Sequence, residues 1–197
     1  MPIPLIEAKQ QLRSRLRSAL HALDADFVAA ASASMVAHLT GPGGLPPSAR
    51  TVALFGGIAG EPDLLSLIPW LVERGRRAVF FGFADGQLVP RLVSHQSQLE
   101  RGIFGVWVPH ATCQVISPQE LDVILTPGLG FDRRGHRLGR GRGHFDRLFA
   151  SRDVLARRIG VCFECQILDE VPVEAHDARM DALVTEAAAI TIDALPG

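Results

Sequence analysis

Apolar side chains recur along the chain with two different periods, which predict helices that alternate with strands. Near the N-terminus, leucines spaced three and four residues apart predict a helix from residue 5 to about residue 23. A second helix is expected over 24–39, because Asp24 is a favourable N-cap and a run of glycine and proline follows. A third is expected to begin at Glu61-Pro62-Asp63 and to run to about Glu73, since proline is common in a first helical turn.

Short apolar runs predict the strands. They lie at residues 51–55, 78–81, 88–93, 123–126, 158–163 and, as the last strand, 181–186. The turn Asp85-Gly86 separates the second run from the third, and Pro127-Gly128 stops the run at 123–126, which should be a central strand. Alternating helices and strands predict an α/β fold with a mostly parallel sheet covered on both faces. Ligands of such sheets bind beyond the carboxyl ends of the strands.

A glycine-rich segment follows the predicted central strand and leads into a helix that begins near His144. Its glycines are at positions 128, 130, 135, 139, 141 and 143, and arginines stand at 133, 134, 137, 140, 142 and 147. Glycines let backbone N–H groups approach a phosphate, a helix N-terminus favours negative charge, and guanidinium groups match phosphate oxygens. The segment therefore predicts a polyphosphate site, although a solvated loop or RNA contacts would have the same composition. Its spacing matches neither the Walker loop nor the dinucleotide fingerprint.

Length, charge and composition favour a single-domain cytoplasmic protein. The 197 residues are expected to form one domain over 1–197, and a net charge of −1 argues against a general nucleic-acid binder. The sequence has no signal-peptide pattern and no apolar run of membrane-spanning length, so a cytoplasmic protein is expected, and three cysteines fit that reducing compartment. Cys162 and Cys165 have C-x-x-C spacing, but in a strand their sulfurs would point to opposite faces. A redox or zinc site is therefore not expected.

The stretch P-G-L-G-F-D-R-R-G-H-R-L-G-R-G-R-G-H-F-D-R at 127–147 resembles the signature of the 5-formyltetrahydrofolate cyclo-ligase family, also called methenyltetrahydrofolate synthetases. The resemblance extends through K-Q-Q-L-R at 9–13, G-E-P-D at 60–63 and V-P-V-E-A-H-D-A-R-M-D-A-L-V-T-E at 171–186, and it is weak over 78–110. It implies a three-layer α/β sandwich and the ATP- and magnesium-dependent closure of 5-formyltetrahydrofolate to 5,10-methenyltetrahydrofolate. The expected partners are these small molecules, without nucleic acid or membrane, and the expected state is a monomer.

The resemblance also implies roles for individual residues. ATP contacts fall on Lys9, Arg13, Arg137, Leu138, Gly139, Arg140, Gly141, Arg142, Gly143, His144 and Phe145. Folate contacts fall on Glu61 and on Arg140, Gly141, Arg142, Gly143 and His144, with Arg140 and Arg142 as the catalytic residues. Magnesium falls on Asp146 and Asp181.

Some of these residues also allow a simpler interpretation. Lys9 is the only lysine in the chain, yet a basic residue on an amphipathic helix usually lies on a solvated face, where alanine is well tolerated. Glu61 would be an ordinary dipole-compensating residue at a helix start. The acids near the C-terminus, with Glu174 and Asp177 among them beside His176, would ordinarily be solubilising surface groups.

Several positions depart from the family pattern. His144 and Phe145 stand where the family has a tyrosine pair, and the chain contains no tyrosine. Leu64 replaces the usual threonine after the glutamate motif, and the pterin-side motif at 81–83 is altered. Two alternatives to the enzyme therefore stay open. One is a cyclo-ligase-like regulatory protein that binds nucleotide, folate or RNA, and the other is a kinase or ligase that acts on another small acid.

Overall fold

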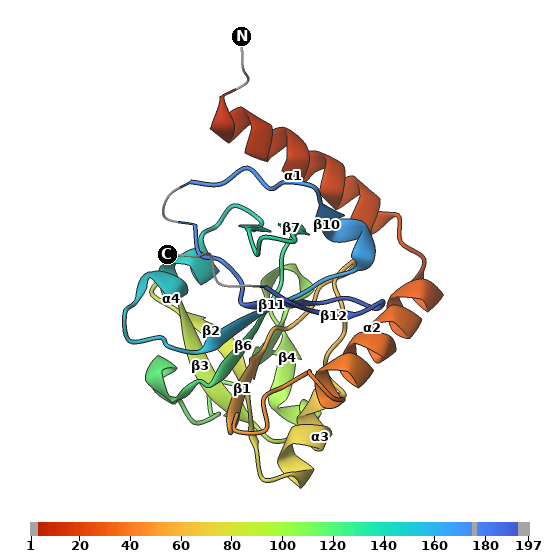
Figure 1. Ribbon diagram of the computed structural model, residues 1–197. Coiled ribbons are helices and arrows are strands. Elements are labelled where there is room, and N and C mark those ends of the chain that lie inside the picture. The colour runs from red at the N-terminus through yellow and green to blue at the C-terminus, as the bar shows by residue number, and fades with distance from the viewer. Residues whose placement is uncertain (1–3, 175–176, 193–197) are drawn as a thin grey trace.

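The computed structural model describes residues 4–174 and 177–192, and within them a seven-stranded sheet forms the centre of the fold (Figure 1). The order across this sheet is β12 (Ala189–Thr191), β11 (Ala182–Val184), β9 (Arg157–Val161), β6 (Val123–Thr126), β1 (Thr51–Leu54), β2 (Arg77–Ala84) and β3 (Gln87–Val93). The strands from β11 to β2 run parallel, whereas β12 and β3 are antiparallel at the two edges. The predicted mostly parallel sheet is confirmed, and β6 is its middle strand, as expected.

Helices cover both faces of the sheet, which gives three layers. They are α1 (Leu5–His21), α2 (Ala25–Thr40), α3 (Leu67–Glu73) and α4 (His144–Ala150), and in Figure 1 α2 and α3 lie on one side of the sheet and α4 on the other. Alternate side chains of β6 point to opposite faces of the sheet. Val123 and Leu125 belong to the core cluster that includes residues of α1, α2 and α3, and Ile124 belongs to the cluster that includes residues of α4. Both faces are buried because a central parallel strand has no solvent side.

Local sequence signals explain the elements that were predicted well. The Asp24 side chain caps α2 by accepting the backbone N–H groups of Asp26 at 2.8 Å and Phe27 at 3.3 Å. The β2–β3 hairpin turns at Asp85 and Gly86, whose φ angles of 49° and 75° are those of the tight turn that suits twisted strands.

The helix expected from Glu61 is wrong at its start, because α3 begins only at Leu67. Local hydrogen bonds hold the preceding residues in turns. The Asp63 carboxylate accepts the N–H of Leu65 at 2.8 Å, and the N–H of Asp63 donates to the Ser32 hydroxyl on α2 at 3.0 Å. Such side-chain bonds compete with a helical turn. Glu61 is therefore not a residue that compensates a helix dipole.

Two further expectations about strands also need correction. The strand at 181–186 is not the last, since β12 follows it as an antiparallel edge. The strand predicted to reach residue 163 ends at Val161, so Cys162 follows it and Cys165 lies in a 3₁₀ turn, Glu164–Gln166. Burial and the nearby carboxylate of Glu164 raise the pKa of the Cys162 thiol well above its ordinary value. This thiol therefore stays protonated at neutral pH.

The glycine-rich segment is not a simple loop. It contains β7 (Gly130–Asp132) and β8 (Arg137–Leu138). In a small separate sheet, β7 pairs with β8 on one side and with β10 (Ile167–Leu168) on the other. A second small pair is formed by β4 (Leu99–Arg101) and β5 (Trp107–Pro109). The other 3₁₀ turns are Gln96–Gln98, Ile103–Gly105 and Pro118–Glu120. The hairpin β7–β8 carries the chain from the end of β6 to the start of α4.

Candidate active site

The Arg137 guanidinium lies at the carboxyl end of β6. Its Nη1 donates to the Pro127 carbonyl oxygen at 3.2 Å, and its Nη2 pairs with Oδ1 of Asp146 at 2.6 Å. Its Cζ is also 5.6 Å from the centre of the Phe145 ring. The side chain is only 5% exposed, and within the described residues its Nε has no hydrogen-bond partner. The guanidinium is therefore fixed in place with one buried donor still unused.

Helix α1 crosses the glycine-rich segment and contacts its backbone (Figure 1). Nε of Arg13 donates to the carbonyl oxygen of Gly139 at 3.0 Å, and Nη2 of Arg17 donates to that of Arg140 at 2.9 Å. Arg13 and Gly139 are 126 residues apart in the sequence. The structure thus brings the first helix and the glycine-rich segment together, as the resemblance implied.

Lys9 lies one turn before Arg13, and its environment differs from the solvated face suggested by its helix. The residue is only 6% exposed. Its Nζ lies 2.9 Å from Oε2 of Glu174 and 2.7 Å from Oδ2 of Asp177. The prediction of an exposed lysine that alanine can replace without cost is therefore wrong. Glu174 and Asp177 are likewise not simple solubilising groups, and His176 between them lies outside the described residues.

These elements surround a polar cavity of about 230 Å³. Its walls are made by Lys9, Arg13, Arg137, Leu138, Gly139, Gly141, Gly143, Asp146, Glu174 and Asp177. Three cationic side chains and three carboxylates therefore converge on backbone that is rich in glycine. Anions bind well to such a combination of fixed cations and accessible N–H groups.

The geometry of this wall requires glycine at position 143 and favours it at position 139. Gly143 has a φ of 66° immediately before α4, a conformation that L residues with a side chain rarely adopt. At Gly139 a Cβ atom would lie 3.0 Å from Nη1 of Arg137, so a side chain there would crowd the guanidinium. The helix that follows has only seven residues, so the side chains and the glycine backbone carry the site rather than a long helix dipole.

Glu61 and Arg140 form a second constellation beside this cavity. Nε and Nη2 of Arg140 lie 2.8 Å and 2.7 Å from Oε1 of Glu61. Oε2 of Glu61 accepts the N–H of Ile58 at 3.2 Å. Glu61 is 9% exposed, whereas about a third of the Arg140 side chain is exposed. The structure therefore brings these two predicted substrate residues together from positions 79 residues apart.

His144 and Phe145 occupy different environments. Nδ1 of His144 accepts a hydrogen bond from Nη2 of Arg147 at 2.8 Å, and its ring contacts Phe83 edge-on with ring centres 5.1 Å apart. Burial, and then the charge of Arg147, lower the pKa of His144, so the ring is neutral at physiological pH. Phe145 packs against the Phe81 ring at 5.9 Å instead. Only His144 therefore keeps a polar edge at the rim.

Arg142 is the more exposed of the two predicted catalytic residues, and its carbonyl oxygen accepts a hydrogen bond from Nη1 of Arg147 at 3.0 Å. Its neighbour Arg140 pairs with the carboxylate of Glu61. The two arginines thus lie on either side of Gly141.

The two carboxylates expected to bind magnesium lie at opposite ends of the parallel strands, one at the carboxyl ends and one at the amino ends. Asp146 pairs with Arg137 at the carboxyl edge, next to Pro127. Asp181 directly precedes β11 at the amino edge, where its Oδ2 accepts the N–H of Arg158 at 2.7 Å. Within the residues that the structure describes, no three histidine, cysteine or acidic side chains form a metal-binding group. Asp146 lines the polar cavity, and Asp181 does not.

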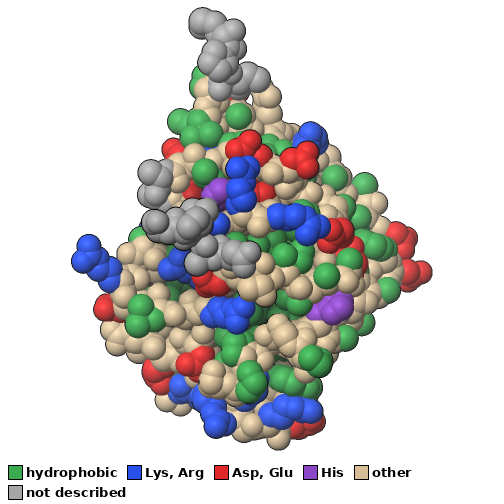
Figure 2. Space-filling model, in the orientation of Figure 1, with side chains coloured by type: hydrophobic (Ala, Val, Ile, Leu, Met, Phe, Trp, Pro, Cys, Tyr) green, Lys and Arg blue, Asp and Glu red, His purple; other side chains and the backbone are tan. Residues whose placement is uncertain are grey.

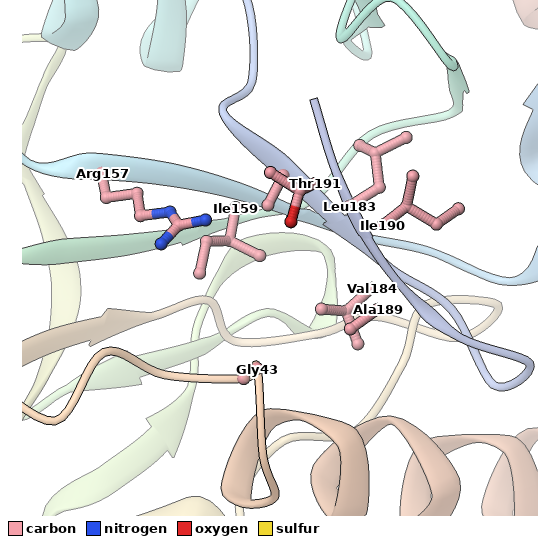
Figure 3. A pocket seen from close by; sticks show the side chains of 10 residues that line it. Gly43, Arg157, Ile159, Leu183, Val184, Ala189, Ile190 and Thr191 are labelled. Atoms are coloured by element: carbon pink, nitrogen blue, oxygen red, sulfur yellow. The ribbon is translucent and has the colours of Figure 1, made fainter. Parts of the chain in front are cut away.

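A second hollow lies on another part of the sheet, near Ile159, Leu183 and Ile190 (Figure 3). Its volume of about 10 Å³ has room for roughly one water molecule, so it is no ligand site. On the face in Figure 2, basic and acidic side chains are interspersed. The helices within residues 4–174 and 177–192 are all too short or too polar to cross a bilayer.

Comparison with known proteins agrees with this geometry. The profile of the 5-formyltetrahydrofolate cyclo-ligase family matches residues 5–186. The chain belongs to this family. It is 33% identical over 153 residues to the 5-formyltetrahydrofolate cyclo-ligase of Mycolicibacterium smegmatis, an alignment that covers 72% of this chain and 76% of the relative. It is also 33% identical over 142 residues to the Escherichia coli K12 enzyme of the same name, with 70% and 78% covered.

Solved structures place this cyclo-ligase in the same fold. The NMR structure of the Aquifex aeolicus 5,10-methenyltetrahydrofolate synthetase superposes with a TM-score of 0.83 at 28% identity, and the match covers 96% of this chain and 95% of the other. The Mycoplasma pneumoniae synthetase has a TM-score of 0.70 at 21% identity, which supports the fold alone. The predicted family, fold class and enzyme class are therefore confirmed.

Proposed function

We propose that this cyclo-ligase uses ATP and magnesium to convert 5-formyltetrahydrofolate into 5,10-methenyltetrahydrofolate, with release of ADP and phosphate. The observation that carries the proposal is the convergence of Lys9, Arg13 and Arg137 on a cavity walled by Gly139, Gly141 and Gly143. These cations come from two segments that are far apart in sequence, and they surround backbone that an oxyanion can approach closely. Together with membership of the family, this arrangement favours a polyphosphate substrate.

The chemistry needs activation rather than a side-chain nucleophile. In the reaction that we propose, the formyl oxygen attacks the γ-phosphorus of ATP and ADP leaves, which gives an N5-iminium phosphate. N10 then attacks the activated carbon and gives up its proton, the C–O bond breaks, and phosphate leaves with that proton as the ring closes. Phosphoryl transfer is accelerated mainly by positioning and by neutralisation of charge. Arg140 and Arg142, on either side of Gly141, are the residues that we assign to this second task.

The cavity of about 230 Å³ is smaller than the roughly 300–1,000 Å³ typical of sites that enclose a whole ligand. We therefore assign it to the phosphates, with Leu138, Phe145 and the three glycines as its walls and support. Glu61 and His144 lie beside it and are assigned to the folate. Glu61 has the buried carboxylate suited to a polar pterin edge, and His144 keeps a polar edge at the rim.

Asp146 is the residue that we propose to hold magnesium, in company with phosphate oxygens and water. The metal supplies charge neutralisation at the phosphates. Asp146 itself holds the Arg137 guanidinium at 2.6 Å, so it orients a cation at the same place. The family resemblance implies Asp181 as a second magnesium ligand, but it lies at the amino ends of the strands, and we propose no metal contact for it.

The test of the function is direct. Purified protein mixed with 5-formyltetrahydrofolate, ATP and magnesium is expected to form methenyltetrahydrofolate, followed by its absorbance, with one ADP and one phosphate released per turnover. Product without ATP, or ATP hydrolysis that never yields methenyl product, would contradict the proposal. Binding of ATP or folate without any product would instead support a cyclo-ligase-like regulatory protein.

Substitution of Asp146 by asparagine is expected to shift the magnesium dependence of the rate to higher concentration, because a charged oxygen ligand is lost at constant size. Asp181→Asn is the matched control. Asparagine there keeps an oxygen that can accept the N–H of Arg158, so the magnesium curve should match that of the wild type. Identical curves for both variants would show that phosphates alone hold the metal, and a shift for Asp181→Asn alone would reverse the assignment.

A further inference from the structure

The carboxylates that contact Lys9 come from the far end of the chain. Asp177 is 168 residues away in sequence, and its Oδ2 lies 2.7 Å from Nζ, while Oε2 of Glu174 lies 2.9 Å away. An ammonium group has three N–H donors. Two are used by these carboxylates, which leaves one for the cavity that Lys9 lines.

The two acids are themselves held in a defined arrangement. Oδ2 of Asp177 also accepts the backbone N–H of Glu174 at 2.8 Å, and the N–H of Asp177 donates to the Glu174 carbonyl oxygen at 3.0 Å. The Asp177 side chain is 17% exposed and that of Glu174 is 40% exposed. Asp177 is therefore tied both to its own backbone turn and to Lys9, whereas Glu174 is the more accessible partner.

This arrangement affects the charge of Lys9. Burial by itself disfavours a charged ammonium. The hydrogen bonds and charges of Asp177 and Glu174 outweigh burial, so the pKa of Lys9 is raised above its ordinary value of 10.5. The other charged groups around the cavity are Arg13, Arg137 and Asp146, and the two cations among them would oppose a third positive charge. The two carboxylates thus keep the pKa of Lys9 above that of an ordinary lysine.

We propose that Glu174 and Asp177 are positioning residues that hold the Lys9 ammonium in the cavity and leave its remaining N–H donor to an anionic oxygen of the nucleotide. This inference rests on the proposed ATP site and adds to it two residues that act through Lys9. If the two carboxylates position Lys9, their removal should weaken ATP binding. If they only repel the nucleotide, removal of two negative charges should strengthen the binding of this anion. The sign of the change in ATP affinity therefore decides between positioning and repulsion.

The lone lysine makes a selective experiment possible. With lysine labelled at the ε carbon, the protein has one lysine side-chain NMR signal, and its titration reports the pKa of Lys9 without any ligand. We expect a wild-type pKa above the ordinary value and, in the double variant Glu174→Gln/Asp177→Asn, a decrease of at least about one unit. Glu120→Gln is the control, since Glu120 pairs with Arg77 near the amino edge of the sheet and should leave the signal unchanged.

ATP titration of the same samples, by calorimetry without folate, gives the functional readout. We expect the double variant to bind ATP roughly 10- to 100-fold more weakly than the wild type. The loss should grow as the pH approaches 10.5, because the lysine of the variant loses its proton at a lower pH than Lys9 of the wild type. In the Lys9→Ala background the two acid substitutions should have no further weakening effect. Thermal melting at each pH identifies any variant that is unfolded.

The outcomes separate the two proposals. Tighter ATP binding by the double variant would show that the carboxylates compete with the nucleotide, and wild-type affinity would show that they do not position Lys9. Either result overturns the inference while leaving the proposed function intact. If the wild type binds no ATP and forms no methenyl product, the function and the inference both fail.

Discussion

Lys9→Ala is expected to weaken the use of ATP by roughly 10- to 150-fold, because one charge-assisted contact of about 1.5–3 kcal/mol is lost. The ammonium lines the cavity together with Arg13 and Arg137. The measurement is the KM for ATP and kcat at saturating folate. Arg15→Ala is the matched control, since Arg15 is an exposed cation on the same helix and does not line the cavity, and its kinetic constants should stay unchanged.

The same substitution should also lower the stability of the fold, which distinguishes a buried lysine from an exposed one. Alanine leaves Asp177 and Glu174 without their cation, and we expect a loss of about 1–3 kcal/mol in the free energy of unfolding. For a chain of this length that corresponds to a decrease in Tm of about 2–12 °C. Lys9→Arg should recover only part of the activity, because a planar guanidinium does not reproduce a compact ammonium between two carboxylates. A wild-type KM and kcat for Lys9→Ala would exclude α1 from the ATP site.

Glu61→Gln is expected to raise the KM for 5-formyltetrahydrofolate by roughly 10- to 100-fold, and the KM for ATP by much less. Glutamine keeps the size of the side chain but removes the charge that pairs with Arg140 and that we assign to the pterin. The measurement is the pair of KM values under conditions where the other substrate is saturating.

Asp63→Asn controls for general damage to the same loop. Asparagine keeps an oxygen that can accept the N–H of Leu65, so the kinetic constants should not change. A larger effect of Glu61→Gln on ATP than on folate would move Glu61 to the nucleotide side. Lower thermal stability with unchanged kinetics would show that the Glu61–Arg140 pair only supports the fold.

The regular elements were readable from the sequence where local signals were strong. Leucine spacing and the Asp24 cap predicted α1 and α2, and the apolar run stopped by Pro127-Gly128 predicted β6 at the centre of the sheet. The prediction failed at residues 61–66 because side chains there bond to the backbone and to α2. A proline flanked by acidic residues is compatible both with the start of a helix and with such a turn. The hydrogen bond to Ser32 on α2 distinguishes the two, and it is not visible in the sequence.

The sequence alone predicted the mostly parallel α/β class, the glycine- and arginine-rich segment that an oxyanion can approach, and the resemblance of that segment to the family signature. It could not determine which charges meet, because the pairs join positions from 79 to 168 residues apart. The path of α1 across the segment decides that Lys9 is buried between Glu174 and Asp177, and strand direction decides that Asp146 and Asp181 lie at opposite edges. The hydrophobic periodicity of a helix or strand indicates which of its faces is buried. Which side chains of different elements pair depends on how those elements cross in the fold.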